Sequence, residues 1–230
     1  MNNFLRSSSY FGIFLTVLTY LLALGIKKRI RSGIANPLLI AAILTISVLL
    51  AGRVDYEIYN SSAQFLTMLL TPATVCLAIP LYQQIEKLKH NFAAIFSGIF
   101  CGSLASLVSV FLLSKLFGFS REEFATFLPK SITTAIGMDV SRELGGYVPI
   151  TVAAIILTGI FGHIISEAIL KAAGIRSRIA KGAAIGTASH AIGTSKAIEI
   201  GEIEGAISSL SIVIAGIITV LLAGLFAELY

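Results

Sequence analysis

The chain has 230 residues, of which 56% are hydrophobic and 13% are charged, and its formal net charge is +5. An ordinary globular domain carries about 25% charged residues, so this composition excludes a soluble globular protein and favours a chain solvated by lipid. The positive charge does not indicate a nucleic-acid partner. The basic residues form short clusters between apolar segments, whereas a nucleic-acid interface needs a basic face interleaved with aromatic side chains.

The first apolar segment, residues 9–26, is followed by the basic residues Lys27, Lys28, Arg29 and Arg31. A signal peptide that is removed would need a small-residue cleavage site before such a cluster, and the sequence has none there. We therefore predict a retained first span. Its C-terminal end should be cytoplasmic, because Lys and Arg accumulate on that side of the membrane.

Six segments are long and apolar enough to cross the hydrocarbon layer, which needs about 20 helical residues. They are residues 9–26, 35–52, 62–82, 91–117, 148–172 and 205–228. Two further segments, 127–146 and 183–201, are long enough but too polar and too rich in glycine to face lipid. The sequence therefore predicts an all-α polytopic membrane protein with about six spanning helices and two polar segments of a different kind.

The charges of the loops constrain how the two polar segments enter the membrane. The densest basic loop runs from Lys171 to Lys181 and should be cytoplasmic. This placement requires segment 127–146 to enter and leave on the outside, and segment 183–201 then enters from the inside. The N-terminus is expected outside a bacterial cell membrane. Each polar segment could be re-entrant or a spanning helix that is broken.

A shift of 56 residues superimposes the two polar segments. Five of sixteen residues are then identical between 130–145 and 186–201. The shift also makes three further pairs, namely Lys115 with Lys171, Gly118 with Gly174 and Ser131 with Thr187. We interpret this pattern as an internal repeat, about 91–146 and 148–201, although apolar segments also resemble one another by chance. Opposed copies with broken helices are typical of inverted-repeat transporters, whose substrates bind near the bilayer midplane.

A third irregular segment is LTPATVCLAIPLYQQ, residues 70–84. Pro72 suits the first turn of a helix, and Thr71 before it can cap that turn. We therefore expect span 62–82 to break near Thr71.

The N-terminal spans lack polar breaks, so residues 1–60 are predicted to be a scaffold or dimer surface and residues 61–230 a transport core. A chain of 24.4 kDa is small for a carrier with its own rigid scaffold. This favours a homodimer.

The candidate substrate-binding residues are hydroxyl, imidazole, ammonium and glycine groups in the three irregular segments. They are Thr71, Thr74, Ser131, Thr133, Thr134, Gly137, Thr187, Ser189, His190, Gly193 and Lys196. Exposed backbone N–H groups at a helix break also favour an anion. Each group has a structural alternative, since a membrane hydroxyl often bonds to the carbonyl of its own preceding turn. His190 could equally be a buried imidazole held by a hydrogen bond.

Four charged residues have two interpretations each. Lys196 could pair with Glu199 or receive an anionic substrate, because a lone ammonium is costly at membrane depth. Asp139 and Glu143 share a helix face and could couple transport to protons or sodium, as could Glu199. The alternative is a surface ion pair of Asp139 and Glu143 with Arg142 or Lys130.

The sequence contains no nucleophile elbow, no metal-binding histidine pair and no phosphate-binding glycine loop. Cys76 and Cys101 stand in apolar surroundings typical of packing residues. We therefore expect no enzyme activity, no cofactor and no metal site.

Three segments together resemble the LrgB/CidB family over nearly the whole chain. They read LTPATVCLAIPLYQQ, LPKSITTAIGMDVSRELGG and GTASHAIGTSKAIEIGEIEGAISSL. Ala135 departs from the pattern, since many members have proline there.

The resemblance implies two functional descriptions. One is an antiholin-like regulator or pore component that acts with a small LrgA/CidA-type membrane protein on murein hydrolase activity and lysis. The other is carboxylate transport, because bacterial relatives are linked to pyruvate uptake and a plastid relative exchanges glycolate and glycerate. A pore needs no opposed polar breaks. The sequence therefore favours a carrier of small monocarboxylates such as pyruvate, glycolate or lactate.

Overall fold

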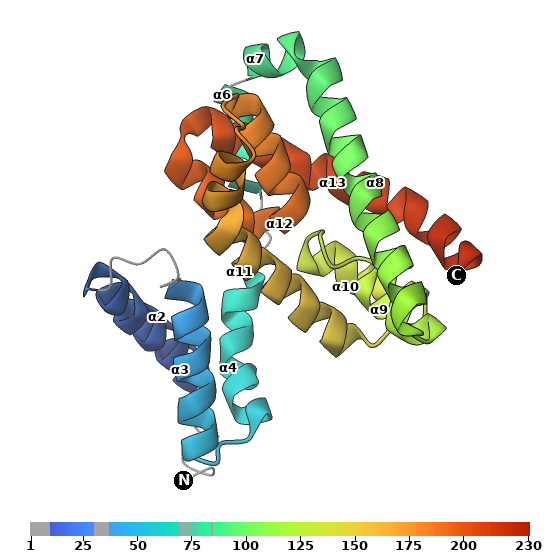
Figure 1. Cartoon of the computed structure of the whole chain (residues 1–230). Helices are drawn as coiled ribbons and strands as arrows, with labels where there is room; N and C mark the ends of the chain where they lie inside the picture. Colours follow the sequence, from blue (N-terminus) through green and yellow to red (C-terminus); the bar gives the residue numbers. More distant parts are fainter. Residues whose placement is uncertain (1–9, 30–36, 70–71, 73–74, 77, 84) are drawn as a thin grey trace. The chain divides into compact units, whose positions relative to one another are not determined.

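The computed structural model describes residues 10–29, 37–69, 72, 75–76, 78–83 and 85–230. Every regular element in these residues is a helix, so the predicted all-α architecture is confirmed (Figure 1). The chain forms two compact units, residues 1–76 and 77–230, here called unit 1 and unit 2.

Unit 1 contains α2 (Phe11–Arg29), α3 (Pro37–Ala51) and α4 (Tyr56–Met68). Pro37 occupies the first position of α3, where a missing N–H costs no hydrogen bond. The Gly12 backbone N–H donates to Ser62 Oγ at 2.6 Å, and the Thr19 and Thr45 hydroxyls lie 2.9 Å apart. These contacts attach α4 and α3 to α2, so the predicted boundary at residue 60 falls inside a helix of unit 1.

The expected span 62–82 is divided between separate helices. Helix α4 ends at Met68, whereas α6 (Ala78–Gln83) and α7 (Ile85–His90) belong to unit 2. The expected break at Thr71 lies outside the described residues.

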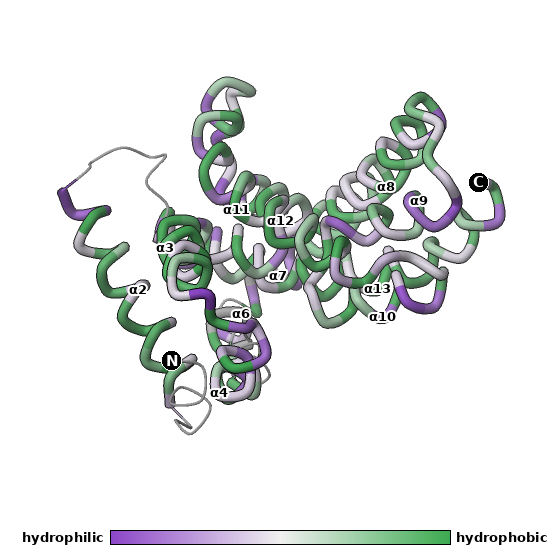
Figure 2. The backbone as a smooth tube through the Cα atoms, turned by 90° about the horizontal axis from the view of Figure 1, so that it is seen from below, coloured by the Kyte–Doolittle hydropathy of each residue, from purple (hydrophilic) through white to green (hydrophobic). Residues whose placement is uncertain are grey.

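Unit 2 is built on three long apolar helices, α8 (Phe92–Phe117), α11 (Val148–Ala172) and α13 (Glu202–Leu229). Each begins and ends within three residues of a predicted span. Within the described part of the chain these helices and α2 have the length and hydropathy of membrane spans, and α3 is a shorter apolar helix. Apolar residues dominate them (Figure 2), and large side chains such as Leu116 and Leu221 are 76% and 74% exposed. Such exposure suits lipid contact.

The two polar segments fold into shorter or broken helices, α9 (Arg121–Phe127), α10 (Thr134–Glu143) and α12 (Arg178–Ile200). Helix α8 stops at Gly118, whose φ of +67° is accessible to glycine. A capping box then starts α9, because Ser120 N–H donates to Glu123 Oε2 at 2.7 Å and Glu123 N–H donates to Ser120 Oγ at 3.2 Å.

The helix bounds recur with the shift found in the sequence. Helices α8 and α11 begin 56 residues apart, at Phe92 and Val148. Both are terminated by a glycine at φ +67°, Gly118 and Gly174, which the same shift pairs. This agreement in backbone conformation supports the internal repeat.

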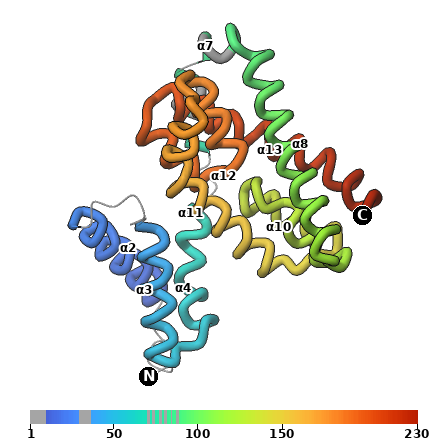
Figure 3. Tube along the Cα trace, in the orientation of Figure 1, coloured from blue at the N-terminus to red at the C-terminus, as the bar shows by residue number. Residues whose placement is uncertain are grey.

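Helix α12 packs against α8, α11 and α13, and Figure 3 lets the reader follow this part of the chain in order. The apolar core between these helices includes Ile99, Ala183 and Ile207. A second cluster, around Phe111, Phe124 and Tyr230, joins the end of α8 to α9 and α13. Unit 2 therefore holds the polar segments on long apolar helices.

Candidate functional site

The two polar segments are interrupted at corresponding positions. Between α9 and α10 the chain leaves the helix over residues 128–133, and Thr133 is the N-cap of α10. Helix α12 is interrupted at Ser189 and His190, where His190 has φ +43° and ψ −143°. The 56-residue shift pairs Thr133 with Ser189. A non-glycine residue in this region of φ and ψ costs about 1–3 kcal/mol and needs support from its surroundings.

Tight packing supplies that support around His190. Its Nε2 lies 2.9 Å from the carbonyl oxygen of Ile155 on α11, and the residue is only 2% exposed. Thr194 Oγ1 donates to the His190 carbonyl at 2.9 Å and lies 2.7 Å from Ser208 Oγ. A β-carbon at Gly193 would lie 2.6 Å from Ser189 Cβ. These residues stabilise the break itself.

An open cavity of about 750 Å³, here called the central cavity, lies between α8, the 128–133 connection and the first half of α12. About half of its lining residues are Gly or Ala, whose small side chains leave room for a solute. Ser131 and Thr187 both line it. The 56-residue shift pairs these two residues, so each segment of the predicted repeat contributes one hydroxyl-bearing residue to the lining, and the Thr187 hydroxyl itself donates to the Ala183 carbonyl at 2.7 Å.

The polar side of the central cavity is a short hydrogen-bonded chain. Lys130 Nζ donates to Ser131 Oγ at 3.1 Å, and Ser131 Oγ lies 2.9 Å from Ser106 Oγ on α8. An ammonium group has three protons, so this single hydrogen bond leaves two for a ligand. Among the residues that the structure describes, no carboxylate forms an ion pair with Lys130. The Lys130 ammonium therefore has no acidic partner among the described residues, and its burial lowers its pKa.

The other predicted binding residues that the structure describes do not line the central cavity. Ser189 Oγ donates to the Ile185 carbonyl at 2.8 Å, and Ser189 is 1% exposed. Gly137 is buried, and a β-carbon there would lie 2.5 Å from Ile155 Cδ1. Thr133 and Thr134 are half-buried at the start of α10. Thr71 and Thr74 lie outside the described residues.

Three of the remaining predicted charges, Lys196, Glu199 and Asp139, form ion pairs. Lys196 Nζ lies 3.2 Å from Glu167 Oε2 and 3.3 Å from Glu199 Oε2, and its side chain is 22% exposed. Asp139 Oδ1 accepts from Arg142 Nη1 at 2.6 Å on an exposed face. Glu143 is also exposed. In this conformation Lys196 pairs with Glu199 and Asp139 pairs with Arg142, whereas no ion pair of Glu143 is described.

Residues 16–229 match the LrgB-like family. The chain belongs to this family. It is 39% identical over 219 residues to the holin-like protein CidB of Staphylococcus epidermidis, covering 95% of each chain. The holin-like protein CidB of Staphylococcus aureus is 40% identical over 207 residues, or 90% of each chain. The antiholin-like protein LrgB of Bacillus cereus is 35% identical over 218 residues, covering 94% of this chain and 95% of the relative. No solved structure matches the chain.

This membership and the apolar helices make the chain a multi-pass membrane protein of the bacterial LrgB-like family. The family resemblance predicted from the three sequence segments is confirmed. The relatives' names, holin-like and antiholin-like, are not those of enzymes.

Lys130, Ser106 and Ser109 line the central cavity but are not among the predicted binding residues. From the sequence, Lys130 is predicted only to be an ion-pair partner. The signal in the sequence was the spacing of Ser106 and Ser109, which puts both hydroxyls on one helix face.

Proposed function

We propose that unit 2 of this LrgB-like chain carries a small monocarboxylate across the membrane. This proposal rests on one observation. The Lys130 ammonium faces a cavity lined by hydroxyls and has no described carboxylate partner.

A carboxylate complements this cavity, because the described lining residues include a lysine and hydroxyls but no acidic side chain. Its two oxygens accept hydrogen bonds, and a bond between an ammonium and a carboxylate is about twice as strong as a neutral one. Ser106 and Ser131 bond to each other through one hydroxyl proton, so the other hydroxyl proton of the pair can be donated to a second carboxylate oxygen. The Thr187 hydroxyl already donates to the Ala183 carbonyl at 2.7 Å and contributes only an acceptor to the cavity wall. The Gly and Ala walls leave room for a small organic anion. Pyruvate, glycolate and lactate fit this description.

The helix interruptions at 128–133 and at Ser189–His190 suit a mechanism in which one repeat moves against the other. Non-helical backbone at membrane depth is tolerated where it is buried in protein or lines a wet cavity, and residues 130–131 line such a cavity. In inverted-repeat carriers one repeat moves against the other around a fixed site. Ser131 and Thr187, one from each repeat, are placed for that mechanism. Coupling to protons or sodium through Asp139, Glu143 or Glu199 remains a prediction.

The second candidate is a regulator or pore component that acts through a small LrgA/CidA-type partner and influences murein hydrolase activity and lysis. The printed names of the relatives favour this candidate more than a carrier. It needs contact surfaces and no solute site. The exposed apolar side chains Ile43, Ile46 and Leu50 of α3 could contact such a partner or a second copy of the chain, and a homodimer remains our expectation.

Ligand-induced stabilisation of the purified protein separates these candidates. We expect pyruvate or lactate to raise the thermal unfolding midpoint in a concentration-dependent way, because a ligand that binds only the folded state stabilises it. The neutral amides of the same acids have similar shape but no charge, so they should have no effect. Equal shifts with acid and amide, or none with the acid, would favour the partner-dependent regulator.

A further inference from the structure

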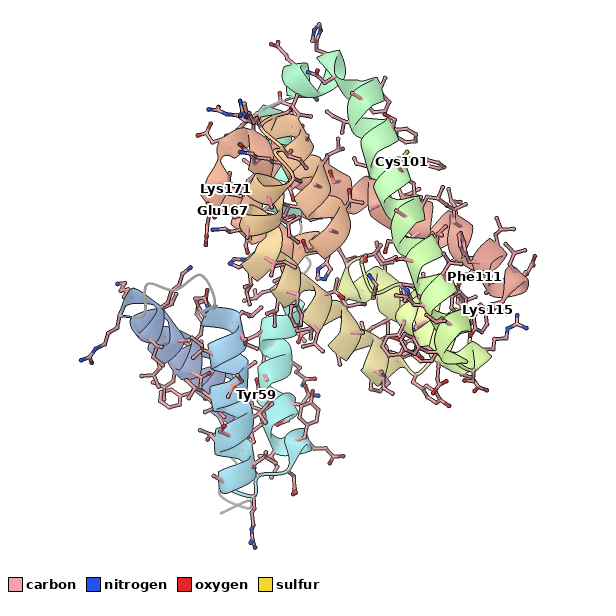
Figure 4. All side chains as sticks on the ribbon, in the orientation of Figure 1. Tyr59, Cys101, Phe111, Lys115, Glu167 and Lys171 are labelled. Atoms are coloured by element: carbon pink, nitrogen blue, oxygen red, sulfur yellow. The ribbon has the colours of Figure 1, made fainter. Side chains whose placement is uncertain are left out.

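A second cavity of about 450 Å³, here called the basic cavity, lies where α11 ends and α12 begins. Gly174, with φ +67°, turns the chain sharply between these helices. The turn brings Lys171, Arg176 and Lys181 to the lining of the same cavity. Figure 4 labels Lys171 together with Glu167, which precedes it by one turn of α11 and also lines the cavity.

The charges in the basic cavity do not balance. Its one carboxylate, Glu167, is already engaged, because Glu167 Oε2 lies 3.2 Å from Lys196 Nζ. In the part of the chain that the structure covers, no carboxylate forms an ion pair with Lys171, Arg176 or Lys181. Three converging cations therefore lack an anion.

The floor of the basic cavity is apolar. Leu170 is 5% exposed and packs in a small cluster with Ile175 and Ile200, and all three line the cavity. The cavity lies at the end of the membrane-spanning helix Val148–Ala172. A cationic rim above an apolar floor at this depth suits an amphiphile with a phosphate head.

We propose that the basic cavity binds the phosphate of an anionic phospholipid. Arg176 can contact two phosphate oxygens at once through its guanidinium group, and Lys171 and Lys181 add two point charges. The first methylene groups of the lipid's acyl chains cover Leu170, Ile175 and Ile200. Basic clusters are expected on the cytoplasmic face, where anionic lipids of the inner leaflet would fill the site.

Native mass spectrometry of the purified full chain tests this proposal with short-chain phosphatidylglycerol, phosphatidylcholine and inorganic phosphate as probes. We expect phosphatidylglycerol to be retained and the zwitterionic lipid to be lost. Each cation near a membrane surface contributes about fivefold in affinity for an anionic lipid. The double variant Arg176→Gln, Lys181→Gln should therefore bind phosphatidylglycerol roughly 30-fold more weakly.

The matched control is Lys28→Gln, Arg29→Gln, which removes two exposed cations from the end of α2 in unit 1. It should bind phosphatidylglycerol like the wild type. Equal retention of both lipids would overturn the proposal, as would an equal loss in both double variants. Displacement of phosphatidylglycerol by an equal concentration of inorganic phosphate would overturn the lipid assignment. Circular dichroism of each variant checks that it is folded.

Discussion

Replacing Lys130 by Gln is expected to weaken monocarboxylate binding by about ten- to a hundredfold while the protein stays folded. Lys130 is the cation of the central cavity that lacks a described carboxylate partner, and its Nζ lies 3.1 Å from Ser131 Oγ. A hydrogen bond to a charged group contributes about 1.5–3 kcal/mol, which corresponds to that loss of affinity. Titration calorimetry of the purified variant with pyruvate measures the change.

Two further lysine variants test whether the loss of binding is specific to Lys130. Lys196→Gln tests the alternative in which Lys196 receives the substrate, and we expect it to change binding little because its ammonium is engaged by Glu167 and Glu199. Lys89→Gln removes an exposed charge of the same unit and should behave like the wild type. A large loss in Lys196→Gln with normal binding in Lys130→Gln would move the substrate site to the second half of α12.

Replacing Gly186 by Ala is expected to destabilise unit 2 by about 1–3 kcal/mol, the usual effect of overpacking a tight core. Gly186 lies on α12 against α13. A β-carbon there would lie 2.8 Å from Ser208 Cα, so the backbone of α13 would have to move. The midpoint of unfolding in a detergent series measures the effect.

The matched control for this variant is Gly224→Ala, on α13, where a β-carbon meets nothing within 4 Å. Alanine is a better helix former than glycine by about 0.5–1 kcal/mol, so this variant should be as stable as the wild type or slightly more stable. If Gly186→Ala unfolds at the same midpoint as Gly224→Ala, the close contact between α12 and α13 is wrong.

The bounds of the long helices of unit 2 were predictable from the sequence, because the length of an apolar segment largely determines where a membrane-spanning helix begins and ends. Val148–Ala172 has the predicted bounds, and Phe92–Phe117 differs by one residue. The repeat paired Gly118 with Gly174, and both have φ +67° at a helix end. Hydropathy could not show that residues 62–68 pack on α2, because that contact depends on a hydroxyl at Ser62 meeting a glycine far away in the sequence.

The candidate site was predictable only in part. The repeat paired Ser131 with Thr187, and both line the central cavity. The sequence could not decide which lysine faces a ligand. The choice depends on Glu167, which lies on a different helix from Lys196 and neutralises it at 3.2 Å. Such a distance follows from the way helices pack, and local sequence does not encode it.

Uptake by liposomes that contain the purified protein tests most directly whether the chain is a carrier. We expect saturable uptake of radiolabelled pyruvate or lactate, accelerated when unlabelled carboxylate is trapped inside, with entrapped dyes retained. Release of entrapped dyes in order of their size, with no saturable uptake, would contradict a carrier and identify a pore. If neither uptake nor release occurs, the carrier is also contradicted, and the result favours the partner-dependent regulator.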